Sequence, residues 1–270
     1  MCAKVLPKEV RMKICGDYHL HTTASDGRCS ILAHAKRADE AGLDEIAITD
    51  HGFASTFFHV TRKKFDEQER QISALDCKVR VLHGVEANVL NKRGDIDIPR
   101  DVIRRCDVLC AGFHRYIGSK GERRGGADYT WLLKNGFGSK KTRQKLIDDN
   151  TDAFVAMLKK FPVDTVAHLN HRALVDVARV AEVAKETGAF VELNEKHIDA
   201  LDEWADALVR SGVNFIVGTD AHSAKKTGKT DKIQEFVKRH GIDPDRVFGL
   251  GDNKPKFKDK KEWCENGNEF

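Results

Sequence analysis

The chain has 270 residues, of which 40% are hydrophobic and 33% are charged, and its formal net charge is +4. This composition fits one globular domain and excludes a largely disordered chain, while the small net charge does not by itself argue for nucleic-acid binding. No apolar stretch approaches the roughly 18 residues that span a bilayer and the N-terminus lacks the apolar core of a signal peptide, so we expect a cytoplasmic protein with no membrane partner.

Short β-rich runs alternate with helical patterns along the chain, which is typical of a parallel sheet or barrel. The predicted strands cover residues 13–21, 45–51, 79–87, 107–114, 164–169, 189–194 and 214–222. The predicted helices cover residues 30–42, 58–75, 142–161, 174–188 and 200–212, with Ser30 and Thr142 as N-caps. Seven strand units with helical crossovers favour a closed or nearly closed α/β barrel, formed by one domain over residues 1–270.

Three segments interrupt this alternation. Residues 89–98 predict a small hairpin that turns at Arg93 and Gly94. Residues 115–141 form a basic, Gly- and Lys-rich insertion, and loops of that length are usually lids or binding loops. The lysine-rich tail, residues 251–270, is interpreted as a solvated terminus without a function.

Potential metal ligands stand at the ends of most predicted strands. They are His19, His21, His51, Glu86, His114, His168, Asp220 and His222. In a β/α barrel the C-terminal ends of all strands open on one rim, so we expect these side chains to converge there. The spacing of His19 and His21 puts both on one face of a strand, and Asp220 and His222 repeat that spacing.

These residue types indicate the kind of metal. Imidazole and carboxylate ligands suit Zn²⁺, Mn²⁺ or Fe²⁺, and the seven cysteines form no Cys-x-x-Cys pair that would indicate a thiolate site. The candidates outnumber the ligands that one ion needs, which predicts two or three ions. Glu86 is the natural bridge between ions, because its two oxygens can bind different metals.

Six motifs in order resemble the polymerase-and-histidinol-phosphatase (PHP) family of metal-dependent phosphoesterases, in particular its stand-alone bacterial members. They are "DYHLHTTASDG", "AITDHG", "GVEAN" followed by "GDIDI", "AGFH", "VAHLNH" and "VGTDAHS", and they run from residue 17 to about residue 223. The resemblance implies a distorted (β/α)7 TIM-like barrel with three divalent metal ions.

The resemblance also assigns the ligands. The first ion is held by His19, His21, Glu86 and Asp220, the second by Glu86, His114 and His168, and the third by Asp26, His51 and His222. For Asp26 the alternative is an ordinary Asp-Gly turn. Many family members have proline after the histidine of the fifth strand, whereas "LNH" follows His168 here, so His171 is the alternative ligand.

The predicted reaction is hydrolysis of a phosphomonoester, either a small metabolite or a nucleotide. No nucleophilic side chain is evident, so the nucleophile is expected to be water whose pKa is lowered by bound metal. Phosphodiesterase or 3'-5' exonuclease action on nucleic acid is the main alternative, since the basic insertion suits either kind of substrate. Amidohydrolase chemistry and a non-catalytic, metal-stabilised module are further alternatives. No obligate protein partner is evident.

Other residues are assigned supporting roles. Candidate substrate contacts are Arg115, Arg123, Arg124, His171, Lys196 and His197. Asp50 either orients His51 or caps the following turn. His83 is interpreted as packed or solvated on the strand face opposite Glu86, and His34 as a surface residue of a helix.

Overall fold

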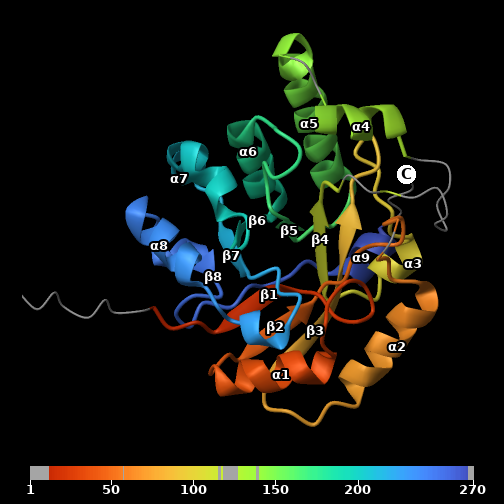
Figure 1. The fold of residues 1–270 in the computed structure, drawn as a ribbon, viewed down its shortest axis with the longest axis vertical. Coiled ribbons are helices and arrows are strands. Elements are labelled where there is room, and N and C mark those ends of the chain that lie inside the picture. The colour runs from red at the N-terminus through yellow and green to blue at the C-terminus, as the bar shows by residue number, and fades with distance from the viewer. Residues whose placement is uncertain (1–11, 57, 115–116, 118–126, 138–139, 267–270) are drawn as a thin grey trace, which may run out of the picture.

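The computed structural model describes residues 12–56, 58–114, 117, 127–137 and 140–266. Its eight parallel strands form one sheet in sequence order (Figure 1). They are β1 (Gly16–Leu20), β2 (Glu45–Ile48), β3 (Arg80–Asn88), β4 (Val108–Gly112), β5 (Thr165–Val166), β6 (Phe190–Asn194), β7 (Phe215–Gly218) and β8 (Val247–Phe248). The seven predicted strands are confirmed, and β8 is an addition too short to leave a pattern in the sequence.

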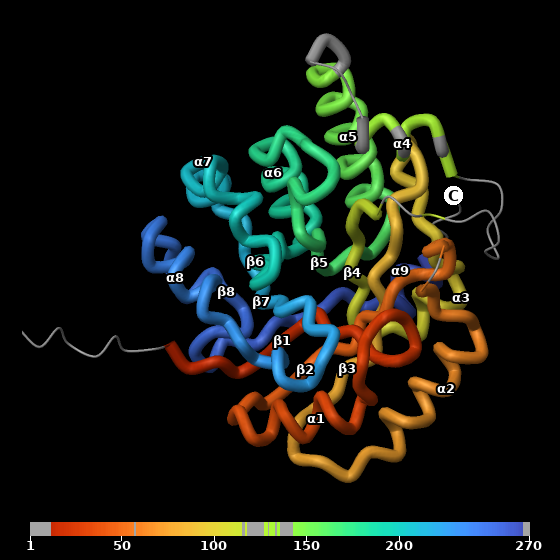
Figure 2. The backbone as a smooth tube through the Cα atoms, in the orientation of Figure 1, coloured from red at the N-terminus to blue at the C-terminus, as the bar shows by residue number. Residues whose placement is uncertain are grey.

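The sheet curls into a nearly closed barrel, as the tube in Figure 2 shows. Every pair of neighbouring strands runs parallel. At the closure, Leu20 at the end of β1 forms a parallel bridge with Ala221, which follows β7. Near the start of β1, the Cys15 and Gly16 N–H groups donate to the carbonyl of Gly249, at 2.9 and 3.3 Å. The predicted distorted TIM-like barrel is therefore confirmed.

Helices lie outside the strands and connect them (Figure 1). The α-helices are α1 (Ile31–Glu40), α2 (Arg62–Ser73), α3 (Arg100–Ile103), α4 (Tyr129–Phe137), α5 (Lys140–Lys160), α6 (Val177–Thr187), α7 (Ala205–Ser211), α8 (Asp231–Arg239) and α9 (Lys260–Glu265). Three short 3-10 helices are η1 (Ile198–Trp204), η2 (Ala224–Lys226) and η3 (Pro244–Arg246). Across the described part of the chain, no helix combines the length and the apolar character needed to cross a membrane.

The predicted helix starts are confirmed at one site and wrong at another. Ser30 caps α1, because its hydroxyl accepts the Ala33 N–H at 3.3 Å. Thr142 does not cap α5, because that helix already begins at Lys140. The first turn of α5 therefore includes two lysines that the sequence pattern left outside the helix.

The predicted hairpin over residues 89–98 is confirmed. Val89 and Ile96 form an antiparallel bridge, and the Leu90 N–H donates to the Asp95 carbonyl at 2.8 Å. Gly94 makes the turn with a φ of 74°, a left-handed conformation that favours glycine. The hairpin extends β3 beyond the barrel rim.

The predicted insertion is only partly a loop, because α4 occupies residues 129–137 of it. Its arginines, Arg115, Arg123 and Arg124, lie outside the described residues, so their predicted contact with substrate stays a prediction.

Most described residues of the tail are exposed or half-buried, but the prediction of a solvated tail is wrong at Lys260. Lys260 and Asp164 form an ion pair at 2.5 Å between side chains that are only 2% and 1% exposed. The Lys260 ammonium also donates to the Asp107 carbonyl at 2.7 Å, and the Lys258 N–H donates to Asp164 at 2.9 Å. The tail packs under the barrel because a buried carboxylate there needs a cation and hydrogen-bond donors.

The barrel interior is apolar at its N-terminal end. Buried side chains from six strands form one cluster there: Tyr18, Ala47, Leu82, Val108, Cys110, Phe190 and Ile216. Side chains on a strand alternate between faces, so within β3 Leu82 shares its face with Glu86. The polar residues at the C-terminal end of the barrel therefore lie above this tightly packed apolar cluster.

Candidate metal centre

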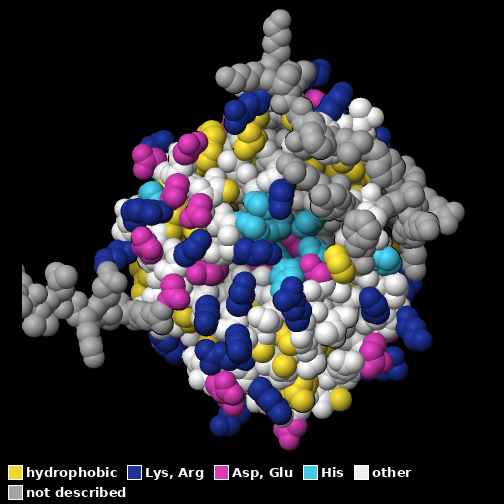
Figure 3. Space-filling model, in the orientation of Figure 1, with side chains coloured by type: hydrophobic (Ala, Val, Ile, Leu, Met, Phe, Trp, Pro, Cys, Tyr) yellow, Lys and Arg dark blue, Asp and Glu magenta, His cyan; other side chains and the backbone are white. Residues whose placement is uncertain are grey.

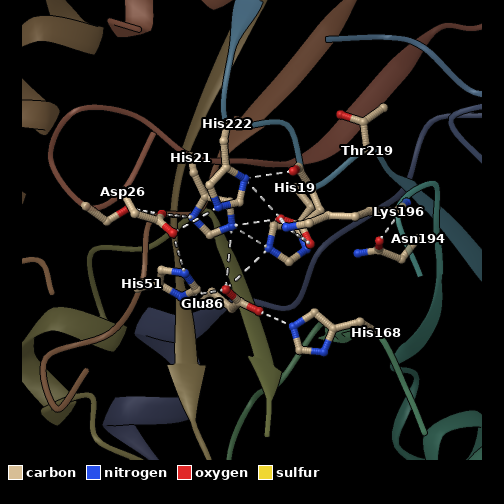
Figure 4. A network of polar contacts seen from close by, with 12 residues as sticks. His19, His21, Asp26, His51, Glu86, His168, Asn194, Lys196, Thr219 and His222 are labelled. Carbon is tan, nitrogen blue, oxygen red and sulfur yellow. Dashed lines mark hydrogen bonds and ion pairs between the residues drawn. The ribbon is translucent and has the colours of Figure 1, made fainter. Parts of the chain in front are cut away.

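Nine predicted ligands gather at the C-terminal ends of the strands. Figure 4 shows most of them around Glu86, with their rings and carboxylates pointing toward one another. His19 and His21 are 1% and 0% exposed, and their Nε2 atoms lie 3.0 Å apart. The structure therefore brings residues from opposite ends of the sequence into one cluster.

Glu86 is at the centre of this cluster, and its two oxygens face different imidazoles. Oε1 lies 2.6 Å from His168 Nε2 and 3.3 Å from His114 Nε2. Oε2 lies 2.9 Å from His51 Nδ1 and 3.4 Å from His19 Nε2. A carboxylate arranged in this way can bridge two cations.

Three overlapping groups place candidate ligand atoms within 4.8 Å of one another. They are His21, Asp26, His51 and His222; His19, His21 and Asp220; and His51, Glu86 and His114. The first group contains all three residues assigned to the third ion, and the second contains three of the four assigned to the first. Asp26 Oδ2 lies 3.0 Å from His222 Nε2, so this aspartate belongs to the cluster as well as to a turn.

His168 and His171 occupy different environments. His168 contacts Glu86, whereas the His171 ring stacks on His197 with a centroid distance of 3.6 Å and an interplanar angle of 18°. The geometry favours His168 as the ligand.

Two of the nine residues have unusual backbone conformations. His168 has a φ of 37° and Asp220 a φ of 50°, both in the left-handed region that non-glycine residues rarely adopt. Each lies two residues beyond the end of its strand, β5 or β7, so the chain turns there and aims the side chain into the barrel mouth. Such strain persists only where the surrounding structure over-determines the conformation.

The polar atoms of the cluster fit divalent cations. His21 Nδ1, His114 Nδ1 and His168 Nδ1 are buried and have no hydrogen-bond partner among the described residues. Burial raises the pKa of Glu86, but the surrounding imidazoles outweigh it and hold that pKa well below 4.5. Burial and the neighbouring rings of His51 and His19 hold the pKa of His21 well below 6.5. Burial lowers the pKa of His51, but the Glu86 carboxylate outweighs it and raises that pKa to about 10, so a cation binding there would displace a proton from this ring.

Glu192, in the middle of β6, supports the cluster and was not predicted. Its Oε1 lies 2.7 Å from His19 Nδ1, and its Oε2 accepts the His168 N–H at 2.6 Å and the Asn194 side-chain amide at 3.0 Å. Gly218 makes room for it, because a Cβ there would lie 1.9 Å from Glu192 Oε1. The sequence signal was a carboxylate inside the apolar run "AFVELN".

Asp50 has neither of the roles predicted for it. It accepts the Thr22 N–H at 2.7 Å and the Thr22 hydroxyl at 2.6 Å, and the Ser25 hydroxyl also donates to it. Among the described contacts it makes no hydrogen bond to His51. It holds the loop that carries Asp26.

Two further buried side chains hold the loops of the site. Asp97, from the hairpin, accepts the Ala54 N–H at 2.7 Å and so fixes the segment after β2. His34 is fully buried, so its prediction as a surface residue is wrong. Its Nε2 donates to the His21 carbonyl at 2.9 Å, and its Nδ1 accepts the Thr227 hydroxyl at 2.7 Å.

His83 packs away from the cluster. Its ring stacks on Phe65 with a centroid distance of 4.2 Å, and the residue is 4% exposed. Burial lowers its pKa to about 4. The packed alternative in the prediction is therefore the correct one.

A cavity of about 390 Å³ opens over the cluster. Three predicted substrate contacts, His171, Lys196 and His197, line it together with Arg172, which was not predicted. The Lys196 ammonium lies 3.3 Å from Asp220 Oδ2. Figure 3 shows histidines gathered at the centre of this face with lysine and arginine side chains beside them.

Comparison with known proteins identifies the family of this chain. The family model described as "PHP domain" matches residues 17–239. The chain belongs to the PHP domain family. Among bacterial relatives, a protein from Acetivibrio thermocellus named a probable phosphatase is 29% identical over 84% of this chain and 87% of its own length. Another protein named a probable phosphatase, from Vibrio parahaemolyticus, is 29% identical over 88% of this chain and 90% of its own length.

The PHP fold is also found in a solved structure. The histidinol phosphate phosphatase of Lactococcus lactis, crystallised with zinc, L-histidinol and phosphate, superposes with a TM-score of 0.59. The superposition covers 90% of this chain and 99% of that protein at 19% sequence identity, a level at which the likeness shows the fold alone.

Proposed function

We propose that the protein hydrolyses phosphomonoesters of small molecules with three divalent metal ions, Zn²⁺, Mn²⁺ or Fe²⁺, at the barrel mouth. The broader assignment, a metal-dependent hydrolase of phosphate esters, follows from its family and from relatives named probable phosphatases. The observation that carries the finer proposal is Glu86, whose two oxygens face separate sets of imidazoles.

The nine clustered side chains would hold the ions in the three sets that the resemblance assigns. Glu86 would be shared between the first and second sets, with His168 rather than His171 completing the second. Bound divalent cations lower the pKa of water into the neutral range and offset the charge that develops on a phosphoryl group during its transfer.

The chain's own residues would bind and orient the reactants. Glu192 fixes the ring of His19 and the backbone of His168, so these two side chains need no rearrangement on binding. Lys196 holds its ammonium 3.3 Å from Asp220 Oδ2 and lines the cavity, so it adds positive charge beside the cluster. In the reaction the oxygen of water bonds to phosphorus, the ester P–O bond breaks, and the alcohol departs with a proton.

The test is a metal analysis coupled to a substrate screen. Protein reconstituted with Mn²⁺, Zn²⁺ or Fe²⁺ is assayed with nitrophenyl phosphate, a panel of phosphometabolites, a nitrophenyl phosphodiester and a single-stranded oligonucleotide. We expect about three metal ions per chain and turnover of monoesters that disappears on chelation and returns with metal. Digestion of the oligonucleotide at comparable efficiency would show the predicted alternative, a phosphodiesterase, to be correct.

A further inference from the structure

Two turns beside the metal centre form one wall of the cavity, which we call the 171/197 wall. It consists of His171, Arg172, Lys196 and His197, all of which line the cavity. The first turn follows β5 and the second follows β6, so adjacent strands present them side by side (Figure 1).

Both turns are fixed before any ligand binds. Asn194 is 1% exposed, and its side-chain oxygen accepts the N–H groups of Lys196 and His197 at 3.0 and 3.1 Å. In the first turn, Asn170 accepts the Val175 N–H at 3.1 Å. A fixed backbone limits the positions that the side chains of these turns can take, which lowers the entropy cost of ordering them on binding.

The wall carries positive charge around a neutral ring stack. The Arg172 Nε–H donates to His171 Nε2 at 3.0 Å, so that nitrogen is an acceptor and the ring is neutral. The remaining four N–H groups of the exposed Arg172 have no partner among the described residues. A guanidinium with free N–H groups in a fork matches the two oxygens of a carboxylate or phosphate.

The wall is close enough to the metal centre to contact the alcohol part of a substrate. The ring centroids of His171 and His197 lie 5.8 and 6.1 Å from that of His168. His197 Nε2 is 3.6 Å from Asp220 Oδ2. A group a few atoms from the reacting phosphorus would therefore reach the wall.

We infer that the preferred substrate is a small phosphomonoester whose alcohol part carries a second anionic group, a carboxylate or a phosphate, that Arg172 and Lys196 recognise. This inference rests on the proposed function for the position of the reacting phosphate. An ester with an ammonium in its alcohol part would be repelled by the same two cations, and one with a neutral alcohol would leave Arg172 unpaired.

The kinetic test compares esters that differ in one group. Glycerol 3-phosphate has a neutral alcohol part, and 3-phosphoglycerate adds a carboxylate. Glycerol 1,3-bisphosphate adds a second phosphate, and phosphoethanolamine carries an ammonium group. We expect kcat/KM at least about tenfold higher for the carboxylate or the bisphosphate than for glycerol 3-phosphate, and lowest for phosphoethanolamine. The ranking of the two anionic esters tells which anion is recognised. Equal rates for the neutral and anionic esters would overturn the inference.

A binding test separates this inference from the proposed function. The affinities of 3-phosphonopropionate and propylphosphonate, which cannot be hydrolysed as esters, are measured by calorimetry on metal-loaded protein. We expect the carboxylate to tighten binding about tenfold, and Arg172→Met to remove most of that difference while Arg172→Lys retains part of it. The exposed Arg210 serves as a control, since Arg210→Met should preserve the preference. A carboxylate preference without ester turnover would contradict the proposed function alone, and equal affinities would overturn the inference alone.

Discussion

Replacing Lys260 by methionine should destabilise the protein severely, although the residue belongs to a lysine-rich tail far from the metal centre in sequence. At 2.5 Å from Asp164 Oδ2, its ammonium provides about 7 kcal/mol of Coulomb attraction at an effective dielectric of about 20, part of which dehydration offsets. Burial raises the pKa of Asp164 even with this ammonium beside it. Methionine keeps the volume but leaves that carboxylate without its cation.

Breaking a buried pair from one side costs about 3–5 kcal/mol, a large part of the 5–15 kcal/mol that stabilises a typical domain. Urea unfolding at pH 7, followed by circular dichroism, measures the loss for Lys260→Met. The matched control is Lys261→Met, because Lys261 is exposed and should change stability by less than about 0.5 kcal/mol. The double variant Lys260→Met/Asp164→Asn should recover part of the loss, because asparagine removes the unpaired charge and keeps one oxygen for the Leu109 and Lys258 N–H groups that Asp164 accepts. If Lys260→Met lowers the free energy of unfolding by less than about 1 kcal/mol, the tail does not stabilise the barrel through the ion pair with Asp164.

Three further predictions concern the metal centre and the fold. Glu86→Gln should lower turnover of nitrophenyl phosphate by more than about 100-fold and reduce the metal content, whereas His83→Gln should retain most turnover. Near-normal turnover by the Glu86→Gln variant would contradict the bridging role. Glu192→Gln should weaken metal binding by about 10–100-fold, as measured by competitive titration with a chelator, and should leave the circular dichroism spectrum unchanged. An unaltered metal affinity would show that Glu192 does not orient His19. The pKa of His83 is 6.5 in the unfolded chain and about 4 in the folded protein, so the unfolded chain binds a proton more readily. The free energy of unfolding therefore keeps its full value above about pH 6.5 and falls at lower pH. Between pH 7 and pH 5 this loss is about 2 kcal/mol, and His83→Gln should abolish it in urea unfolding at the two pH values. If His83→Gln leaves the pH dependence unchanged, burial does not lower the pKa of His83 in the fold.

Most of the ligand cluster could be predicted because its members lie at or near the ends of apolar runs, whereas Asp26 was assigned only by the resemblance to the PHP family. A histidine or carboxylate at the end of a buried strand has to lie at the barrel rim, whatever the loop after it does. The sequence therefore indicated which residues meet there, although it gave no distances. The choice between His168 and His171 depended on a left-handed turn, and nothing in "HLNH" specifies its backbone angles.

The supporting residues could not be predicted, because their roles depend on partners far away in the chain. Glu192 contacts His19 across 173 positions, and Lys260 meets Asp164 across 96. A carboxylate in a strand or a lysine in a tail has the same local pattern whether or not such a partner exists. His34 was misjudged for the same reason, since its partners Thr227 and the His21 carbonyl lie outside its own helix.

The left-handed backbone at His168 and Asp220 costs conformational stability, but it places a side chain in the metal cluster at each position. Glycine adopts these angles without steric cost, so His168→Gly or Asp220→Gly would relieve strain while removing a side chain from the cluster. A library selected only for thermal resistance is therefore expected to collect inactive variants at these positions. Selection on this scaffold would need to score turnover and folding together.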